Sequence, residues 1–378
     1  GENMHTCGEF VVRAGERVGF ELAWSRTYDT PPRRSDIEAS LRDTEEHWAK
    51  WAKRCDYEGE WRESVVRSMI TLKALTYAPT GGIVAAVTTS LPEKLGGVRN
   101  WDYRYCWLRD ATITLYTLLL AGYTSEAKAW REWLLRAVAG SPSQLQIMYG
   151  IGGERRLVEF ELPWLPGYEG SRPVRIGNAA HGQLQLDVYG EVLAAMQQCR
   201  KLGVDGEDSW RVEHALLNFL ESNWQRADYG IWELRGPPRQ LTHSKVMTWV
   251  AFDRGVRAIE RFGKEGPVER WRAIASEIHR DVCTKGFSSR KNSFTQSYGS
   301  EELDASLLLI PLVGFLPASD PRVAGTVAAV ERELVNDGFV ARYRTRQDFD
   351  GLPGGEGTFL PCSFWLVDNL VLLGQRAK

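Results

Sequence analysis

Apolar residues recur at helical spacing through most of the chain after residue 35, and this feature most restricts the possible fold. The predicted helices cover roughly 35–54, 60–78, 109–121, 124–138, 179–202, 207–225, 242–263, 265–284, 301–313, 320–336 and 361–375. Several of them form pairs with short connections, and the long irregular stretches lie at 79–108, 139–178, 226–241, 285–300 and 337–360. Loops this long in a compact domain usually carry function. We therefore expect an all-α ring of helical hairpins with the active residues on one rim.

The first 34 residues follow a different pattern, with alternating apolar residues between Phe10 and Trp24. Val18, Phe20, Leu22 and Trp24 fall on one face, and Ala14-Gly15-Glu16 interrupts the alternation, as in a β-hairpin. Because an isolated hairpin is barely stable, such strands should belong to a larger sheet. We expect residues 1–34 to be the strand remnant and linker of a β domain that precedes residue 1, with the helical domain at 35–378.

Charge and cysteine usage exclude several classes of protein. The net charge is −2 with acidic and basic residues interleaved, which disfavours a nucleic-acid surface or a membrane-surface helix. No apolar run approaches 18 residues, and the start lacks the pattern of a signal peptide. The six cysteines are scattered, without a C-x-x-C or zinc-binding spacing, so we expect a cytoplasmic protein with reduced thiols and no metal site.

Two motifs indicate the chemistry. Glu233 stands between Trp232 and Leu234 in the glycine-bracketed segment Tyr229–Gly236, where apolar neighbours should raise the pKa of its carboxyl group. A raised pKa is what a general acid near neutral pH requires. The earlier segment Asn100–Ala111 alternates aromatic rings with charged groups, a mixture suited to holding a sugar ring. Together, in an all-helical chain, these motifs predict a glycoside hydrolase.

At these residues the chain resembles glycoside hydrolase family 15, the family of glucoamylases and bacterial trehalases. The matching stretches are Gly96–Asp110, Tyr229–Gly236, Leu303–Leu312 and Gly354–Cys362. The resemblance covers about residues 35–378 and is strongest to the bacterial trehalase-like branch. It implies an (α/α)6 barrel, a toroid of helical hairpins, that follows an N-terminal β-sandwich. It also implies that the catalytic domain continues beyond Lys378, because the chain stops where relatives usually continue.

The resemblance also implies roles for particular residues. In the inverting reaction of the family, Glu233 matches the general acid, and Arg109 with Asp110 matches the pair that binds the hydroxyls of the non-reducing glucose. The alternatives are a solvated turn glutamate and a surface ion pair in which Asp110 caps the following helix. Aromatic wall candidates are Trp101, which we favour, Tyr103, Tyr105 and Trp107. Further candidate substrate contacts are Asp102, Trp232, Asn178 and Arg235, and secondary candidates are His181, Gln183, His243 and Lys245.

Glu356, in the glycine-rich segment Gly354–Gly357, is the best candidate for the water-activating base on residue type alone. By the resemblance it matches instead a residue that contacts the leaving sugar, and the base of the family would lie beyond Lys378. We therefore expect Glu356 to bind substrate in preference to acting as the base.

The predicted function is an exo-acting, inverting α-glucoside hydrolase of the trehalase or glucoamylase type, with trehalose favoured. Alternatives are a non-catalytic sugar-sensing domain, an isomaltose- or dextran-specific glucohydrolase, and a sugar epimerase, which would call for a histidine pair. The expected partner is a small or oligomeric α-glucoside, with no nucleic acid and no membrane, and a homo-oligomer is compatible with the sequence. No cofactor is predicted, although some related trehalases depend on Mg²⁺ or phosphate.

Overall fold

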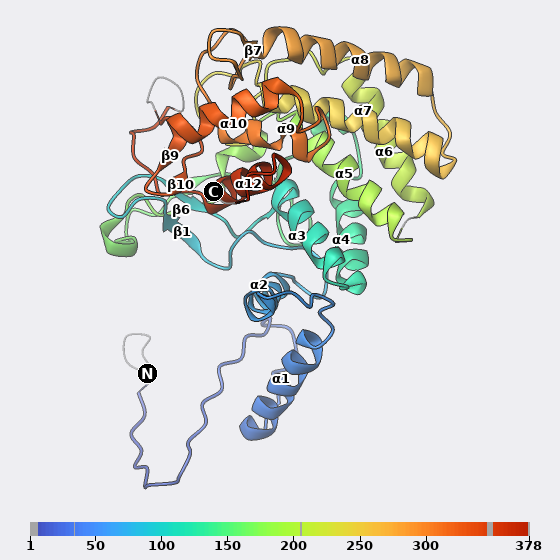
Figure 1. Ribbon diagram of the computed structural model, residues 1–378. Helices are drawn as coiled ribbons and strands as arrows, with labels where there is room; N and C mark the ends of the chain where they lie inside the picture. The colour runs from blue at the N-terminus through green and yellow to red at the C-terminus, as the bar shows by residue number, and fades with distance from the viewer. Residues whose placement is uncertain (1–6, 34, 205, 346–350, 377–378) are drawn as a thin grey trace. The chain divides into compact units, whose positions relative to one another are not determined.

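The computed structural model describes residues 7–33, 35–204, 206–345 and 351–376 and is predominantly helical (Figure 1). Within these ranges the α-helices are α1 (Ile37–Ala52), α2 (Arg62–Ala74), α3 (Leu108–Leu120), α4 (Thr124–Ala137), α5 (Asp187–Lys201), α6 (Glu207–Glu221), α7 (Thr242–Phe262), α8 (Val268–Lys285), α9 (Leu309–Leu312), α10 (Pro321–Leu334) and α12 (Leu360–Leu372). Every predicted helical segment overlaps one of them. The chain divides into two compact units, Gly1–Ile70 and Thr71–Lys378.

Two predicted helices begin later than expected. Residues 179–202 form a 3-10 turn, η3 (Ala179–Gly182), and then α5, because the segment between them bonds to another part of the chain. Leu184 O accepts a hydrogen bond from Tyr229 N at 3.1 Å, and Leu186 N donates to Asp228 Oδ2 at 2.9 Å. In the predicted helix 301–313, Asp304 caps the turn η4 (Ala305–Leu308), which α9 continues.

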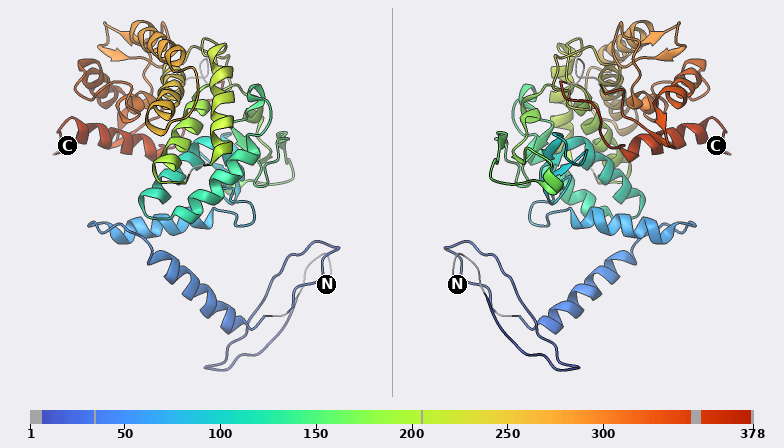
Figure 2. Two further views of the ribbon diagram at one scale, coloured as in Figure 1. Left: turned by 90° about the vertical axis from the view of Figure 1, so that its right-hand side faces the viewer. Right: turned by 90° about the vertical axis from the view of Figure 1, so that its left-hand side faces the viewer.

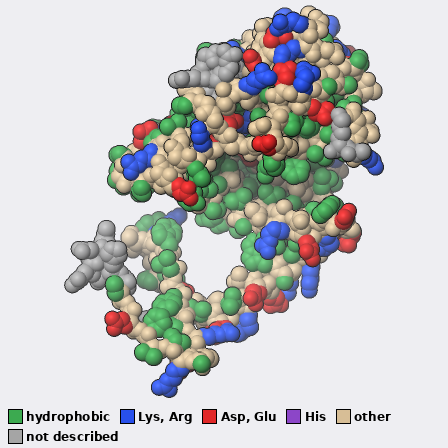
Figure 3. Space-filling view, turned by 60° about the vertical axis from the view of Figure 1, so that its left-hand side comes forward, with side chains coloured by type: hydrophobic (Ala, Val, Ile, Leu, Met, Phe, Trp, Pro, Cys, Tyr) green, Lys and Arg blue, Asp and Glu red, His purple; other side chains and the backbone are tan. Residues whose placement is uncertain are grey.

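The strand prediction for Phe10–Trp24 is wrong for the residues that the structure describes. Residues 7–33 form a turn at Ala14-Gly15 but no strand, which fits the low stability of a hairpin without a wider sheet. Leu22 and Trp24 are among the apolar side chains that remain exposed along this segment. Figure 3 shows hydrophobic side chains along the extended part of the chain. The helix start at Asp36 is confirmed, since its carboxylate accepts from Ala39 N at 3.1 Å. Residues 1–6 and 34 of the predicted remnant, 346–350 of a predicted loop, and 377–378 lie outside the described residues.

In the second unit, α3, α5 and α7 form a row in which each helix contacts the next (Figure 2). α4, α6 and α8 each pack on the preceding member of the row, which gives three helical hairpins. After α7 the row continues with η4 and α9, which both contact α12. Helix α10 packs on η4. Gly190 allows the close approach of α5 to α7, because a Cβ there would lie 2.2 Å from Met247 O.

The core of this unit lies between the two layers of helices. Its largest fully buried side chains include Trp130 and Trp133 of α4 and Trp271 of α8, each no more than 1% exposed. Burial of such a side chain stabilises the fold by about 1.5–3 kcal/mol. By contrast, α3 and α12 leave apolar side chains exposed, namely Ile113, Tyr116, Leu120, Phe364, Val367 and Val371.

Short antiparallel strand pairs fix the long loops at the helix ends. The pairs are β1 (Thr89–Pro92) with β2 (Asn100–Asp102), β3 (Cys106–Trp107) with β4 (Met148–Tyr149), β5 (Phe160–Glu161) with β6 (Arg175–Ile176), β7 (Phe287–Ser288) with β8 (Ser293–Phe294), and β9 (Val335–Asn336) with β10 (Phe339–Val340). In the second pair, Cys106 lies opposite Tyr149 and Trp107 opposite Met148. This pairing holds the segment in front of α3, and the motif residues, in a fixed position.

Candidate active site

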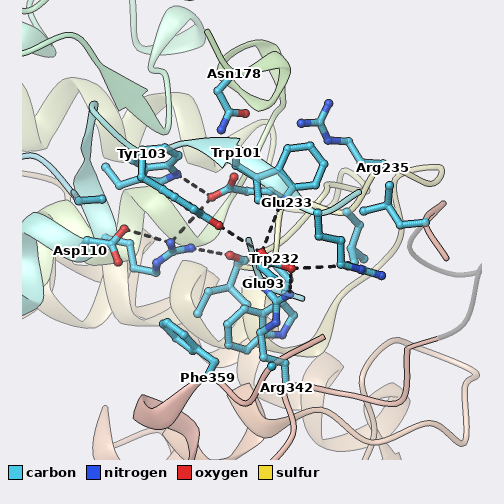
Figure 4. Close-up of a pocket in the computed structure, with 18 of the residues that line it drawn as sticks. Glu93, Trp101, Tyr103, Asp110, Asn178, Trp232, Glu233, Arg235, Arg342 and Phe359 are labelled. Carbon is cyan, nitrogen blue, oxygen red and sulfur yellow. Dashed lines mark hydrogen bonds and ion pairs between the residues drawn. The ribbon is translucent and has the colours of Figure 1, made fainter. Parts of the chain in front are cut away.

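A cavity of about 500 Å³ lies in the second unit, where the long loops meet (Figure 4). Its lining contains nine of the predicted site residues: Trp101, Tyr103, Trp107, Arg109, Asp110, Asn178, Trp232, Glu233 and Arg235. The segments that supply them are separated in sequence by up to about 130 positions, so the fold brings the two motifs to one place. Asp102 and Glu356 are not part of the lining.

Glu233 sits in a tight turn at the cavity wall. Its amide donates to Gly230 O at 3.1 Å, and its backbone has the left-handed value φ = 57°. This conformation is uncommon for a residue other than glycine and often marks a functional site. Gly230 itself has φ = 65°, and a Cβ there would lie 2.3 Å from Leu241 Cδ1. The turn thus presents the carboxyl group to the cavity at the cost of some backbone strain.

The carboxyl group of Glu233 has two close partners. Trp107 Nε1 donates to Glu233 Oε1 at 2.6 Å, and Arg109 Nη2 lies 3.8 Å from the same oxygen. Burial raises the pKa of Glu233, whereas the Arg109 charge and the Trp107 hydrogen bond oppose the rise. The net direction is upward, as the sequence predicted. A carboxyl group in this setting keeps its proton closer to neutral pH than an exposed glutamate does.

Arg109 and Asp110 occupy the first turn of α3 and face the cavity. Arg109 Nη1 donates to Ile231 O at 2.5 Å, and Nη2 donates to Asp110 Oδ2 at 3.0 Å. The helix N-cap is Trp107, whose side chain makes no capping bond, so Asp110 is not the cap. The capping alternative is therefore wrong. A guanidinium and a partly exposed carboxylate side by side can bind neighbouring hydroxyl groups.

Two arginine side chains hold the indole of Trp101. The guanidinium carbons of Arg235 and Arg175 lie 4.7 and 4.8 Å from its ring centroid. Glu159 pairs with both arginines, at 3.0 Å to Arg235 Nη2 and 3.7 Å to Arg175 Nε. Cation–π contacts of this kind fix the orientation of the ring. Trp101 with Arg235 therefore forms one rigid wall of the cavity.

Glu93, which the sequence did not single out, organises the same wall. Its Oε1 accepts from Trp101 Nε1 and from the Tyr103 hydroxyl, both at 3.1 Å. Its Oε2 lies 3.4 Å from Arg342 Nη2, and Arg342 covers the Trp232 ring at 5.4 Å. No local sequence pattern distinguishes Glu93 as a site residue, because it lies in the segment Pro92-Glu93-Lys94, ahead of the Asn100–Ala111 motif. Tyr343 of the lining was missed for the same reason, whereas Arg99 and Phe359 lie within the matching stretches but were not singled out.

Glu356 holds arginines and does not face the cavity. Arg342 donates from Nε to Oε1 at 2.9 Å and from Nη2 to Oε2 at 2.5 Å, and Arg99 Nη1 donates to Oε2 at 3.3 Å. The Glu356 side chain is 9% exposed. Both carboxylate oxygens are held by guanidinium groups, which orients the carboxylate toward Arg342 and Arg99. The structure therefore supports a positioning role for Glu356, through Arg342.

Asp102 has a structural place beneath β2. It is fully buried, and its carboxylate accepts from Arg104 Nε and Nη2, both at 2.9 Å, and from Gly177 N at 3.1 Å. Tyr105 OH also accepts from Gly177 N, so both residues fix a neighbouring loop. Neither can contact a ligand in the cavity.

Most of the secondary candidates form hydrogen bonds to backbone carbonyl groups and do not line the cavity. Gln183 Nε2 donates to Leu234 O at 3.0 Å, and Lys245 Nζ donates to Trp224 O at 2.5 Å. His181 Nδ1 lies 2.9 Å from Asn178 O. Asn178 lines the cavity while its Oδ1 caps η3, whereas His243 is buried on α7.

No group of three or more His, Cys, Asp or Glu in the described ranges could hold a metal ion. Among the helices of those ranges, none is long and apolar enough to cross a membrane.

The chain matches the sequence model of glycosyl hydrolases family 15 over residues 59–377. It is 45% identical over 375 residues to a trehalase of Mycobacterium tuberculosis, across 97% of this chain and 55% of that protein. A trehalase of Thermoplasma acidophilum is 43% identical over 339 residues, across 89% of this chain and 58% of that protein. The chain thus spans little more than half the length of these curated relatives.

Solved structures share the fold at low sequence identity. A bacterial glucoamylase in complex with acarbose superposes with a TM-score of 0.68 at 12% identity, over 90% of this chain and 52% of that chain. A glycosidase variant in complex with glucose gives a TM-score of 0.65 at 20% identity, over 83% of this chain and 80% of that chain.

Proposed function

The chain belongs to glycoside hydrolase family 15, and on this premise we propose that its cavity hydrolyses an α-glucoside from the non-reducing end. The observation that carries the proposal is the Glu233 carboxyl group, which lies in the cavity wall with a raised pKa beside Arg109 and Asp110. This arrangement combines a proton donor with groups that bind sugar hydroxyls. A volume of about 500 Å³ is in the range of small-molecule sites.

In the proposed reaction Glu233 donates its proton to the glycosidic oxygen as the bond from the anomeric carbon to that oxygen breaks. A water molecule adds from the opposite face and loses a proton to a second carboxylate, so the configuration inverts. Trp107 and Arg109 stabilise the Glu233 carboxylate that is left behind. Arg109 and Asp110 hold the non-reducing glucose, and Arg235, Asn178 and Trp232 line the remaining wall.

The water-activating carboxylate is not Glu356 in this proposal, because two arginines engage it. Of the other carboxylates that line the cavity in the described ranges, Glu93 accepts from Trp101, Tyr103 and Arg342, and Asp110 pairs with Arg109. We infer that a segment outside the described residues supplies the base.

Trehalose is the proposed substrate, since the relatives at 36–45% identity are trehalases. An isomaltose glucohydrolase of Kribbella flavida is 27% identical over 292 residues and makes isomaltose the second candidate. Arg235 and the Trp101 wall, which stand beside Glu233, are proposed to select between the linkages.

The proposed architecture is an (α/α)6 barrel. Support comes from the three hairpins of the helix row, and from the exposed apolar side chains of α3 and α12, which such a barrel would cover. Residues 1–34 are proposed to belong to a β domain, where the exposed Phe20, Leu22 and Trp24 would be buried. We also propose a cytoplasmic location, because the six cysteines are scattered along the sequence without the spacing of a disulfide framework.

The test is glucose release from trehalose, maltose, isomaltose and starch by the purified protein, with and without Mg²⁺ and phosphate. Proton NMR of the first product identifies its anomer. Release of α- and β-glucose in equal amounts from trehalose supports the proposal, because the leaving glucose keeps its α configuration while the attacked one inverts, and release of α-glucose alone would refute the inverting mechanism. Saturable binding of glucose without turnover of any substrate would support the sugar-sensing alternative.

A further inference from the structure

Glu93 joins two segments that are distant in sequence. It directly follows β1, and its amide donates to Arg99 O at 3.0 Å, which extends the hairpin of β1 and β2. Its carbonyl group accepts from Gly357 N at 2.7 Å, in the segment that precedes α12. Because the backbone of Glu93 is bonded on both sides, its side chain extends from a fixed point at the cavity wall.

The carboxylate of Glu93 contacts four other residues that line the cavity, and Figure 4 shows it among Trp101, Tyr103 and Arg342. Oε1 accepts hydrogen bonds from Trp101 Nε1 and from the Tyr103 hydroxyl group, both at 3.1 Å. Oε2 lies 3.4 Å from Arg342 Nη2 and 3.9 Å from Arg99 Nη1. The side chain is 19% exposed, so water competes little for these contacts.

The two contacts of Oε1 depend on Glu93 more than the contacts of Oε2 do. Glu356 accepts from both guanidinium groups near Oε2, at 2.9 and 3.3 Å, so these groups have a second carboxylate. An indole and a phenol each have a single proton to donate. Trp101 and Tyr103 both give that proton to Glu93.

The hydrogen bond to Glu93 determines what Tyr103 can offer to a ligand. An ionised carboxylate accepts hydrogen bonds and cannot donate them. The phenol proton therefore points to Glu93, and the Tyr103 oxygen keeps only lone pairs for a group in the cavity. A sugar hydroxyl group can donate to such an oxygen.

Tyr103 also lies close to the candidate acid. Its ring centroid is 5.8 Å from that of Trp107, and Trp107 Nε1 donates to Glu233 Oε1 at 2.6 Å. Burial, Glu93 and Glu233 raise the pKa of Tyr103, so the phenol keeps its proton at neutral pH. We therefore expect a glucoside bound beside Glu233 to meet a neutral Tyr103 whose proton is already donated.

We propose that Glu93 is a positioning residue for the glucoside: by accepting the phenol proton it makes Tyr103 an acceptor for a sugar hydroxyl group. The inference rests on the proposed function of the cavity and adds a residue outside the acid and the sugar-binding pair. Because the same carboxylate oxygen holds the Trp101 indole, Glu93 orients the Tyr103 oxygen and the adjacent wall together.

The test is Glu93→Gln, which keeps the length and shape of the side chain. An amide group accepts hydrogen bonds on one side only, so it cannot serve both pairs of donors. We expect its oxygen to stay with the guanidinium groups, because hydrogen bonds to charged groups are the stronger ones. Its NH₂ group then faces Tyr103, which must accept that bond and turn its own proton toward the cavity.

Two measurements follow this reversal. The first is the ¹³C NMR signal of Tyr103 Cζ in protein with labelled tyrosine, assigned from Tyr103→Phe, and we expect it to shift in Glu93→Gln. The second is sugar binding by calorimetry in the Glu233→Gln background, where the candidate acid is removed and turnover is not needed. The dissociation constant of the best bound among trehalose, maltose and isomaltose should rise about tenfold in Glu93→Gln, since the sugar loses one hydrogen bond.

A double-mutant cycle with Tyr103→Phe separates this role from a general loosening of the cavity. If Glu93 acts through Tyr103, Glu93→Gln should weaken sugar binding by about twofold or less once the phenol oxygen is gone. The same loss in both backgrounds overturns the inference. Tyr103→Phe also serves if Glu93→Gln does not fold, because the ¹⁵N NMR signal of the Trp101 indole, which shares Oε1, should then move. An indole signal that stays in place overturns the shared contact and the inference with it.

Glu333→Gln is the matched control. Glu333 of α10 is 17% exposed, pairs with Lys291 Nζ and Arg332 Nη2, each at 2.7 Å, and does not line the cavity. Its substitution should lower the melting temperature slightly and leave the Tyr103 signal and the dissociation constant unchanged.

An unchanged Tyr103 signal in correctly folded Glu93→Gln overturns the inference, whatever the melting temperature. Failure of the Glu233→Gln protein to bind any of the three sugars rejects the proposed function, and the inference with it. Sugar binding by that protein that Glu93→Gln does not weaken retains the proposed function and rejects the role of Glu93 alone.

Discussion

Replacement of Trp107 by phenylalanine isolates one contact of the candidate acid. Trp107 Nε1 donates to Glu233 Oε1 at 2.6 Å, and phenylalanine keeps most of the ring but has no donor. A hydrogen bond to a charged group contributes about 1.5–3 kcal/mol. At about 1.4 kcal/mol for each pKa unit, its loss corresponds to about one to two units. Arg109, 3.8 Å from the same oxygen, remains and limits the change.

The direction of the pKa change depends on which form of the Glu233 carboxyl group the Trp107 hydrogen bond stabilises. The indole N–H stabilises the carboxylate, so its loss raises the pKa of Glu233, which burial has already raised. The alkaline limb of the kcat/KM profile for trehalose should therefore move to higher pH by about one unit. Without the indole N–H the carboxyl group is less well oriented, so kcat/KM should also fall about tenfold or somewhat more.

Trp130→Phe supplies the control. Trp130 is 0% exposed, and its Nε1 has no hydrogen-bond partner, so the substitution removes packing alone. Both variants should melt at lower temperature, but Trp130→Phe should keep the pH profile of the wild-type protein. An alkaline limb that stays in place or moves to lower pH in Trp107→Phe would refute the assigned contact.

Three further predictions concern the same cavity. Glu233→Gln should lower kcat by about 10²–10⁴ with glucose affinity retained, and near wild-type turnover would contradict its role as the acid. Asp110→Asn should raise KM without lowering the melting temperature, since Asp110 does not cap α3; a change in melting alone would contradict sugar binding. Glu356→Gln should weaken substrate binding by releasing Arg342 and leave the pH profile unchanged, whereas loss of the acidic limb would identify Glu356 as the base. Finally, the folded-state pKa of Asp187 is raised from 3.8 to about 7, so wild-type stability should fall between pH 4 and 7. The melting difference in favour of Asp187→Asn should grow over that range, and a constant difference would contradict it.

Local physical effects explain why the helices and the Glu233 turn were predictable. Helical spacing of apolar residues is encoded within a few turns of chain, so the predicted segments each overlap a helix. The Tyr229–Gly236 segment holds both the acid and the glycine that its turn requires, since Gly230 adopts φ = 65°. Arg109 and Asp110 are adjacent in sequence, and their pairing follows from that adjacency.

Contacts between distant segments account for the predictions that were wrong. The helix expected from residue 179 starts at Asp187, because Leu184 and Leu186 bond to the Glu233 turn. The strand pattern at residues 10–24 is a local signal, but a strand forms only when another strand accepts its hydrogen bonds.

The sequence by itself determined that this is a helical member of its family, and it singled out Glu233 as the candidate acid and Arg109 with Asp110 as the candidate sugar-binding pair. Only the tertiary structure decided which hydrogen bonds and ion pairs the surrounding charged side chains form. It placed Glu93 against Trp101 and Tyr103 and directed Glu356 away from the cavity, toward Arg342. These pairings join loops that are as many as about 250 positions apart, where local propensity carries no information. Burial and charge compensation fix such contacts, and both depend on the packing of the whole unit.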